Sequence, residues 1–503
     1  MFRMSGPVKF QSLEICLDAT SNDWNFAIMF SKGQLIELDI TDAADGIKCF
    51  GKLDDGIGVF VHGALAVGDR VEAEIFKIKK NYLEAWLRNI IAPAPVRVTP
   101  CCAHVGACGG CKWQHVAYAE QLRMKRKMVA DALAHIGGFD DVAVDDAIAA
   151  PDAFHYRNKV EFSFGDARYL LDEEKNLQGE ELAKPRDYAL GFHAANLFSK
   201  VVDIDRCHIA TEEMNVALEL AKRFFRERKI SVCSNHTHEG FLRNLALRHA
   251  AFSGEFMVYL ITSSYDEALM KEFLSALLEA FGPKLTTFVN GTTQRKNSVA
   301  YADAFHVMHG AGFITEQLGR CHFNISPNSF FQTNSRQALR LYEVTTEAAA
   351  LKPSDVLHDL YCGTGSIGIF CADACARVVG FELEASSIRD AGANATLNGI
   401  SNIEFHQIDM KNFGKIASSA PRPDVVITDP PRAGMHENTV AVLRDLAPRR
   451  IVYVSCNPAS LARDAAALCA GGLYKLTRVQ PMDLFPHTLH IESVATLERL
   501  TSN

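Results

Sequence analysis

The sequence predicts a multidomain α/β protein that ends in a Rossmann-like, doubly wound domain. In residues 336–503, short β-branched strands alternate with helical stretches, and the first strand runs into a glycine-rich turn. This order is typical of a parallel sheet covered by helices on both faces. In residues 45–92, short alternating strands are separated by Asp-Gly and Gly-Asp turns, which indicates a small β-barrel. Residues 96–335 mix both patterns, and we expect an α+β domain there.

Length and composition set the first limits. A chain of 503 residues, 48% of them hydrophobic, suffices for about three domains with proper cores. No run approaches the roughly 18 apolar residues of a membrane-spanning helix, and the N-terminus lacks a signal-peptide core. We therefore expect a cytoplasmic protein without a membrane partner. The net charge of −8 gives no overall attraction to nucleic acid, so any RNA-binding surface must be local.

The N-terminal domain is expected to cover residues 1–95, with the barrel at about 45–92. Barrels of this size often bind oligonucleotides, although a role in packing alone fits the sequence equally well. Residues 1–45 show no readable function. A cluster of prolines that starts at Pro93 marks a linker to the central domain.

Three cysteines after the linker, Cys102, Cys108 and Cys111, have the spacing C-x5-C-x2-C. Fourteen cysteines in a long cytosolic chain indicate metal or thiol chemistry rather than disulfides. Cys207 follows a strand-like run and stands alone, which makes it the candidate for a fourth thiolate. The asymmetric spacing and the Gly-Gly pair favour a [4Fe–4S] cluster, with structural zinc as the alternative.

A helix with a basic face follows this motif at residues 121–133. In a chain that is acidic overall, such a helix is a candidate phosphate-contacting surface, with an ordinary solvated face as the alternative. The stretch 95–130 holds six cations, Arg97, Lys112, Arg123, Lys125, Arg126 and Lys127, against one acid, Glu120.

The rest of the central domain offers two more candidate RNA contacts. Residues 156–159, Tyr-Arg-Asn-Lys, open a strand with two cations and an aromatic ring. Phe330 and Phe331, followed by Gln332, could stack on a base and hydrogen-bond to its edge. Core packing explains the two phenylalanines equally well. Residues 172–190 form a polar insertion to which the sequence assigns no function.

The glycine-rich turn at 362–368 joins the strand 356–361 to a helix. The second strand ends near Glu382 and the third at Asp409. Glycines let a nucleotide approach the backbone, and a carboxylate at the end of the second strand accepts hydrogen bonds from ribose hydroxyls. The pattern G-x-G-x-x-G fits NAD as well as S-adenosylmethionine. Asp359, just before the turn, suits the cationic end of S-adenosylmethionine.

The next two strands end in residues with reactive side chains. The strand 425–428 is followed by Asp-Pro-Pro-Arg at 429–432, and the strand 451–455 by Cys456 and Asn-Pro. Open α/β sheets bind ligands at the carboxyl ends of their strands, and Asn-Pro would hold a thiol at the mouth of such a cleft. A lone cysteine is more often a buried structural residue, but the neighbouring motifs reverse that expectation.

Four segments in this order carry a family resemblance: DLYCGTGSIGIF, ITDPPRAGM, VYVSCNPASLARD and DLFPHTLHIESV. They closely resemble the uracil-C5 RNA methyltransferase family, whose members use S-adenosylmethionine and have a class I methyltransferase domain. The N-terminal barrel resembles the TRAM domain of this family, and the cysteine motif resembles the iron–sulfur motif of its 23S ribosomal RNA branch. The resemblance covers nearly everything from about residue 50 onward and outweighs the NAD interpretation.

The resemblance implies a role for each candidate residue. Cys456 would be the nucleophile that adds to C6 of a uridine, and Glu492 the base that removes the C5 proton. The cofactors would be S-adenosylmethionine and a [4Fe–4S] cluster held by the four cysteines. The partner would be RNA, and the protein would act as a monomer. The expected cofactor-binding residues are Gln332, Tyr361, Gly363, Ser366, Glu382, Asp409 and Asp429.

The motifs also weigh against rival functions. An amine-directed methyltransferase would need an Asn-Pro-Pro-aromatic turn where this chain has Asp429, and a cytosine-C5 enzyme would have a second cysteine near Pro430 or Pro431. A non-catalytic RNA-binding or folding factor would not need Cys456 and Glu492 together. For the substrate, a cluster with a TRAM-like module favours 23S ribosomal RNA, and transfer RNA is the alternative.

Overall fold

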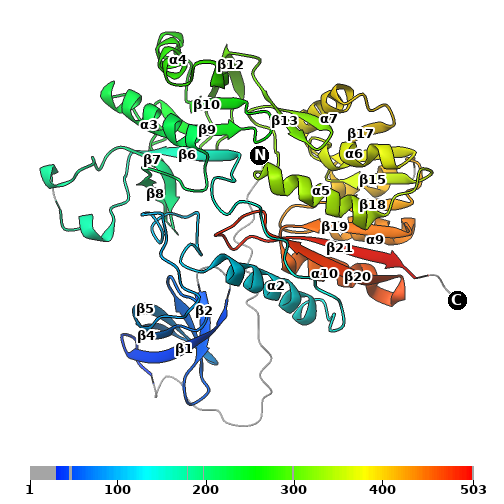
Figure 1. Ribbon diagram of the computed structural model, residues 1–503, viewed down its shortest axis with the longest axis horizontal. Coiled ribbons are helices and arrows are strands. Elements are labelled where there is room, and N and C mark those ends of the chain that lie inside the picture. The colour runs from blue at the N-terminus through cyan, green and yellow to red at the C-terminus, as the bar shows by residue number, and fades with distance from the viewer. Residues whose placement is uncertain are drawn as a thin grey trace. The chain divides into compact units, whose positions relative to one another are not determined.

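The computed structural model describes residues 30–44, 48–177, 179–195, 197–296, 299–417 and 419–500 (Figure 1). The chain divides into two compact units, one ending at Ala94 and the other beginning at Pro95. Most of the N-terminal segment 1–45, which the sequence left without a function, lies outside the described residues. Within the described ranges, no helix is long and apolar enough to cross a membrane.

The strands described for the first unit close into a barrel in the order β1-β2-β3-β5-β4. Alternate side chains of these strands, such as those of Val59, Val61 and Ile75, point inward and are completely buried. This alternation follows from the two-residue period of a strand, and it confirms the predicted barrel. The strands are β1 (Leu35–Ala43), β2 (Lys48–Lys52), β3 (Gly58–His62), β4 (Arg70–Ile78) and β5 (Tyr82–Ala92).

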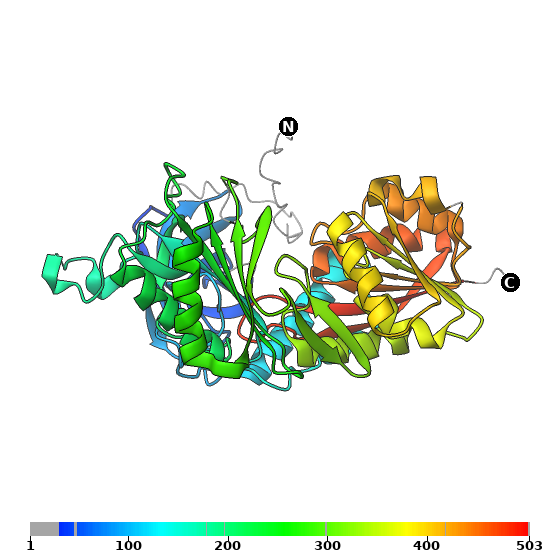
Figure 2. The same ribbon diagram turned by 90° about the horizontal axis from the view of Figure 1, so that it is seen from above.

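The second unit contains a mixed sheet in the order β12-β11-β10-β9-β6-β7-β8. Helices α3 (Glu212–Glu227) and α4 (Glu267–Phe281) cover one face of this sheet and bury a phenylalanine-rich core with it. Figure 2 shows these green helices on the side turned away from the yellow and orange sheet. The strands are β6 (Lys159–Gly165), β7 (Ala189–Ala194), β8 (Leu197–Asp203), β9 (Leu242–His249), β10 (Phe256–Thr262), β11 (Leu285–Thr292) and β12 (Ala304–His309).

The same unit ends in a second sheet, in the order β17-β16-β15-β18-β19-β21-β20. The members from β17 to β19 pair in parallel, whereas β21 pairs antiparallel with both β19 and β20. This topology confirms the predicted doubly wound domain. The strands are β15 (Val356–Leu360), β16 (Arg377–Glu382), β17 (Ile403–Gln407), β18 (Val425–Thr428), β19 (Arg450–Ser455), β20 (Tyr474–Met482) and β21 (Glu492–Arg499).

Helices pack on both faces of this second sheet. One face buries its side chains with α5 and α6, and the other with α2, α9 and α10. The short helix α8 (Gly414–Ala417) and α7 complete the layers. The remaining helices are α2 (Tyr118–His135), α5 (Ser335–Ala349), α6 (Ser366–Cys371), α7 (Ala385–Leu397), α9 (Glu437–Leu446) and α10 (Pro458–Cys469).

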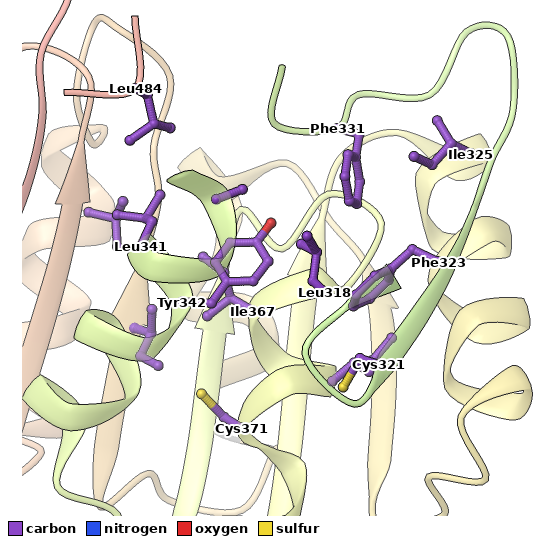
Figure 3. Packing of buried hydrophobic residues seen from close by; sticks show 14 of the residues in the cluster. Leu318, Cys321, Phe323, Ile325, Phe331, Leu341, Tyr342, Ile367, Cys371 and Leu484 are labelled. Carbon is purple, nitrogen blue, oxygen red and sulfur yellow. The ribbon is translucent and has the colours of Figure 1, made fainter. Parts of the chain in front are cut away.

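One hydrophobic core joins the two sheets of the second unit. The hairpin of β13 (Ile314–Leu318) and β14 (Cys321–Ile325) packs between the inner face of the first sheet and helices α5 and α6. Figure 3 shows Phe323 of this hairpin and Phe331 directed toward Tyr342 of α5. Because side chains in a shared core are close-packed, the two sheets and any site formed between them have a defined geometry.

Helix α2 corrects one residue of the predicted basic RNA-binding face, Lys125. Lys125 is completely buried, and its Nζ lies 2.6 Å from Oδ1 of Asp483, which is also completely buried. Arg123 pairs with Glu120, and Lys127 with Asp131. The prediction was wrong for Lys125 because the helix packs against α10 and β20, and the burial of a residue by distant segments is invisible in its local sequence.

Candidate active site

A cleft of about 1520 Å³ opens at the carboxyl ends of the parallel strands. It includes the carboxyl ends of the parallel neighbours β15 and β18. After β15 the chain continues to β16 and β17 on one side, and after β18 to β19 on the other, and such a switch point is where open α/β sheets bind ligands. The cleft brings together most of the residues singled out in the sequence, from several different elements. Those that line it are Gln332, Tyr361, Gly363, Glu382, Asp409, Asp429, Cys456 and Glu492.

The turn after β15 has a backbone shape that depends on its glycines. Tyr361, Gly363 and Gly365 have positive φ angles of 59°, 55° and 74°. A Cβ atom on Gly365 would lie 2.8 Å from the ring of Phe405, so this position requires glycine for space as well as for φ. The turn leads directly into helix α6, whose first residue is Ser366. Of this turn, Tyr361 and Gly363 line the cleft.

Glu382, at the end of β16, is held in place by backbone amides. One carboxylate oxygen accepts hydrogen bonds from the amides of Leu383 and Glu384 at 2.7 and 2.9 Å, and the other accepts one from Gly363 at 3.1 Å. The carboxylate therefore bridges the second strand and the glycine turn. This is the position from which an acidic residue accepts hydrogen bonds from ribose hydroxyls.

Two further carboxyl groups, Asp359 and Asp429, lie at the strand ends and form no ion pair with any residue that the structure describes. Burial raises the pKa of Asp359 to about 7, and the negative charges of Asp429 and Glu382 add to the effect. Burial alone raises the pKa of Asp429 to about 7. One oxygen of Asp359 accepts from the amide of Gly368, whereas the other has no hydrogen-bond partner among the described residues. Such unpaired buried acids are typical of functional sites.

Cys456 and Glu492 lie opposite each other at the ends of two neighbouring strands. Ser455 of β19 pairs with Ser493 of β21, and the next residues in this antiparallel register are Cys456 and Glu492. Glu492 is 4% exposed, and burial raises its pKa well above the ordinary value. Burial, followed by the charges of Glu492 and Asp429, raises the pKa of Cys456 to about 11. A thiol and a proton-accepting group therefore face one ligand volume.

Asn457 connects the Cys456 turn to the Asp-Pro-Pro-Arg loop. Its side-chain oxygen accepts from the amide of Ala459 and caps α10, and its side-chain nitrogen donates to the carbonyl of Arg432 at 2.8 Å. Proline at the first position of α10 fixes the start of this helix. The Asn-Pro sequence thus couples the thiol to the loop that carries Asp429.

The loop between β20 and β21, residues 483–491, is anchored by distant segments. Its carbonyl at His487 accepts hydrogen bonds from the amides of Lys112 and Trp113 at 2.7 and 3.0 Å. The hydroxyl of Tyr156 donates to the carbonyl of Pro486 at 3.1 Å. The loop ends beside Glu492, so the cysteine-rich segment and helix α2 help to fix the end of β21.

Comparisons with known proteins agree with this geometry. Residues 243–500 match the family model described as tRNA (Uracil-5-)-methyltransferase, and residues 30–87 match the TRAM domain. An uncharacterized RNA methyltransferase of Chlorobaculum tepidum is 48% identical over 475 residues, which cover 94% of this chain and 98% of the relative. Another, of Porphyromonas gingivalis, is 39% identical, with 92% and 100% covered.

The chain belongs to the tRNA (uracil-5-)-methyltransferase family. Among solved structures, Pyrococcus abyssi tRNA (uracil-54, C5)-methyltransferase in complex with S-adenosyl-L-homocysteine matches with a TM-score of 0.69 and 30% identity. The match covers 92% of this chain and 100% of that one. Membership confirms the predicted class, an S-adenosylmethionine-dependent RNA methyltransferase with an N-terminal TRAM domain.

Three of the four candidate cluster cysteines lie in the core of the first sheet, and the fourth, Cys102, is close enough to Cys207 for their charges to interact. Cys207 is buried there, and Cys108 and Cys111 pack against the same cluster of side chains. Burial raises the pKa of Cys108 to about 12 and that of Cys111 to about 11, and the charges of the other cysteines contribute. Across the described ranges, however, no three His, Cys, Asp or Glu side chains are arranged as a metal site.

Several residues of the cleft were not assigned to it from the sequence. Arg157, Phe330, Arg432 and His490 also line it, and Arg432 contacts the ring of His490. Burial, with the charge of Arg432, lowers the pKa of His490 to about 4. The cations of the Tyr-Arg-Asn-Lys segment were the available signal for Arg157.

Ser366 departs from the predicted cofactor set. Within the part of the chain that the structure describes, it does not line the cleft, and its hydroxyl is hydrogen-bonded to that of Tyr342 at 2.8 Å. The hydroxyl of this first residue of α6 therefore links α6 to helix α5.

Proposed function

We propose that this methyltransferase methylates C5 of a specific uridine in 23S ribosomal RNA through a covalent bond between Cys456 and C6 of the base. The observation that carries this mechanism is the register of β19 and β21, which sets Cys456 opposite Glu492. A nucleophile on one side of the uracil and a base on the other are the two groups that C5 methylation needs, because C5 alone is a poor nucleophile.

The bond changes balance as follows. Cys456 loses its proton and its sulfur bonds to C6, so the C5=C6 electron pair moves toward the C4 carbonyl and makes C5 nucleophilic. S-adenosylmethionine, when bound, would supply an electrophilic methyl group; the bond from the methyl carbon to the sulfonium sulfur breaks, the electron pair stays on sulfur, and S-adenosylhomocysteine is the leaving group. After C5 has bonded to the methyl carbon, Glu492 removes the C5 proton; the freed pair restores the C5=C6 bond, and sulfur leaves C6.

The charges of the cleft link cofactor binding to thiol ionisation. In the free protein, the pKa of Cys456 near 11 keeps it a neutral thiol at physiological pH, and Asp429 contributes to this rise. A sulfonium cation bound beside Asp429 acts in the opposite direction and lowers the pKa of the thiol. The guanidinium of Arg432 acts in the same direction as the sulfonium.

The remaining carboxylates would bind the cofactor. Glu382, fixed by three amides, would accept from the ribose hydroxyls. Asp359 and Asp429 would face the cationic end, and Asp409, which pairs with Lys411 at 2.7 Å, would lie farther along the cleft. Gln332, Tyr361 and the amide of Gly363 would complete the pocket. Ser366 would support the turn from behind.

The cysteines Cys102, Cys108, Cys111 and Cys207 would bind a [4Fe–4S] cluster. Their chemistry supports this, because all four are soft thiol donors, Cys108, Cys111 and Cys207 share one buried region, and the amide of Gly110 donates to the sulfur of Cys108 at 3.4 Å. Anaerobically purified protein should contain about four irons per chain and lose them in Cys111→Ala. Cys101→Ala is the matched control, which should retain iron; stoichiometric zinc in the wild type would contradict the proposal.

The RNA class has two candidates. A TRAM domain together with the cysteine motif supports 23S ribosomal RNA as the substrate. The Pyrococcus abyssi structure is named as a tRNA methyltransferase and matches over 92% of this chain, which favours transfer RNA as the second candidate. A cytoplasmic location follows from either substrate. Sequencing of 5-methyluridine in both RNA fractions, with and without the gene, separates the two.

The covalent mechanism is tested by transfer of a labelled methyl group to RNA from cells that lack the gene. Cys456→Ala should give neither methyl transfer nor a protein–RNA adduct on denaturing gels. Cys469→Ala, a control in which a thiol outside the cleft is removed, should retain both. Methyl transfer by Cys456→Ala at a rate near that of the wild type would overturn the mechanism.

A further inference from the structure

A second cavity, of about 300 Å³, lies beside the active-site cleft. Arg157, Phe330 and Thr333 line both spaces, so they form the boundary between them. The second cavity is otherwise lined by Lys159, Glu161, Phe192 and Phe331. Its volume is at the lower end of the range for small-ligand sites and suits a single nucleotide rather than a whole cofactor.

Phe330 stands on this boundary as an exposed ring. It is 65% exposed, whereas its neighbour Phe331 is 4% exposed and belongs to the shared core. Arg248, completely buried, donates to the carbonyls of Ser329 and Pro327 and so fixes the loop that presents Phe330. Exposed aromatic rings on a fixed loop are the usual platforms on which unpaired bases stack.

Arg157 lies at the same boundary and has hydrogen-bond donors that the described residues do not use. Its Nε donates to the carbonyl of Lys159 at 2.8 Å, which fixes the plane of the guanidinium. The hydrogen bonds of the described residues leave its two terminal nitrogens without an acceptor. A planar guanidinium with two parallel free donors matches the geometry of a phosphate group.

The charge of the second cavity also favours an anion. Arg157 and Lys159 line it and Arg248 lies next to Lys159, whereas Glu161 is the acid on its wall. Lys159 and Glu161 form an ion pair, which leaves the charge of Arg157 unbalanced at the boundary. The cavity therefore combines aromatic surface with net positive charge, the two properties that bind single-stranded nucleic acid.

We propose that the second cavity binds the nucleotide next to the target uridine, with Phe330 between the two bases and Arg157 on the phosphate that joins them. The proposal rests on the proposed function, because it requires a uridine in the larger cleft. It gives this enzyme a way to read one neighbour of its target. It also explains why Arg157, about 300 residues before the nucleophile in the sequence, lines the same cleft.

The test uses a labelled RNA of nine nucleotides with one central uridine flanked by adenosines, so that the uridine sets the register. Two modified forms lack the base on the 5′ or on the 3′ side of the uridine. Phe330→Ala should weaken binding of the intact RNA by about tenfold, within the range for one stacked base. With one of the two abasic RNAs the same variant should bind within about twofold of the wild type.

The phosphate contact is tested with a neutral methylphosphonate on either side of the uridine. Arg157→Gln should weaken binding of the intact RNA by about tenfold. When the methylphosphonate replaces the phosphate that Arg157 contacts, the variant and the wild type should bind the RNA equally. Lys271→Gln is the matched control, since it removes one positive charge from the same domain at a residue that lies outside both cavities. Iron content is measured in parallel, because the charge of Arg157 also reaches the thiols of Cys111 and Cys207.

If the effect of each variant on RNA affinity disappears when the RNA is altered on one side of the uridine, and only on that side, the second cavity is supported as a nucleotide site. Strictly additive effects at both flanks would overturn it, as would a loss of binding that follows loss of iron. Because the readout is RNA binding, this result is independent of the proposed reaction. Absence of methyl transfer to any RNA by the wild-type enzyme would instead refute the proposed function.

Discussion

Two of the regions of the second unit that bury charged side chains differ in one respect. In the first, Lys125 and Asp483 are both completely buried and lie 2.6 Å apart. In the second, at the carboxyl ends of the strands, Asp359, Asp429 and Glu492 are desolvated and form no ion pair with another described residue. The pKa of each is raised, and at Glu492 the charge of Arg432 offsets only part of the rise.

This difference separates structure from chemistry. A buried charge with a good partner holds two segments together; here the pair joins α2 to the loop that precedes Glu492. A buried acid without a partner stores an electrostatic cost that only a ligand or a proton can relieve. By this criterion the strand-end acids form the functional group of the cleft, and substitutions in the two regions should have opposite effects on stability and activity.

The largest effect is expected at Glu492. Glu492→Gln removes the proton acceptor but leaves the thiol, so turnover should fall by about 100- to 10,000-fold, the usual contribution of a general base. The reaction should stall with methylated RNA still bonded to Cys456. Denaturing electrophoresis with a labelled methyl donor would show this species. Stability should be unchanged or higher, because a desolvated acid is replaced by a neutral amide.

Two outcomes would contradict this role. Turnover at the wild-type rate would mean that Glu492 is not the base. A folded variant that forms no adduct would place Glu492 earlier, in binding or orienting the uracil. Asp483→Asn is the useful comparison, because it removes a buried carboxylate from the partnered region instead.

The second effect concerns the Lys125–Asp483 pair. Lys125→Ala or Asp483→Asn leaves one buried charge uncompensated and should lower the free energy of unfolding by about 3–5 kcal/mol. Urea unfolding measures this loss. The double change Lys125→Met and Asp483→Leu replaces both charges by apolar groups and should recover most of it. If the double variant is no more stable than the single ones, the pair is not the reason for the loss.

The same comparison explains what the sequence could and could not predict. The glycine turn, Glu382 and Cys456 follow short apolar strands, so their positions at one sheet edge follow from local pattern and topology. The burial of Lys125 could not be predicted, because its partner is 358 residues away. Arg157 was noted as a possible RNA contact but not as a residue of the cleft, since only the packing of the two sheets brings it there.

The third effect is on cofactor affinity and its dependence on pH. Asp359 and Asp429 have pKa values raised to about 7, so both are largely protonated at pH 6 and ionised at pH 8. The affinity for S-adenosylmethionine should therefore rise with pH across this window, by up to about tenfold per unit below pH 7 for one carboxylate. Calorimetric titration at several pH values measures it.

S-adenosylhomocysteine is the control for this dependence, because its sulfur carries no charge. Its affinity should vary less over the same window, and Asp429→Asn should reduce the difference between the two ligands. Equal pH profiles for the two ligands would show that these acids do not face the sulfonium. The stability of the ligand-free protein should have the opposite pH dependence to the affinity for S-adenosylmethionine. A raised carboxyl pKa makes the folded state less stable as pH rises through 7.

The smallest effect is expected at Arg123, and it distinguishes a paired cation from an unpaired one. The Nη2 and Nε groups of Arg123 donate to the two carboxylate oxygens of Glu120, at 2.6 and 2.8 Å, on the exposed side of α2. A surface pair of this kind contributes less than about 1 kcal/mol, so Arg123→Gln should barely change the free energy of unfolding. RNA affinity should change by less than about twofold, since the guanidinium already has its acceptor.

The salt dependence of RNA binding decides the matter: loss of one phosphate contact lowers its slope by about one, which we expect for Arg157→Gln and not for Arg123→Gln. Equal slopes in the two variants would return helix α2 to the RNA-binding surface and show that pairing inside the protein does not prevent a cation from contacting RNA.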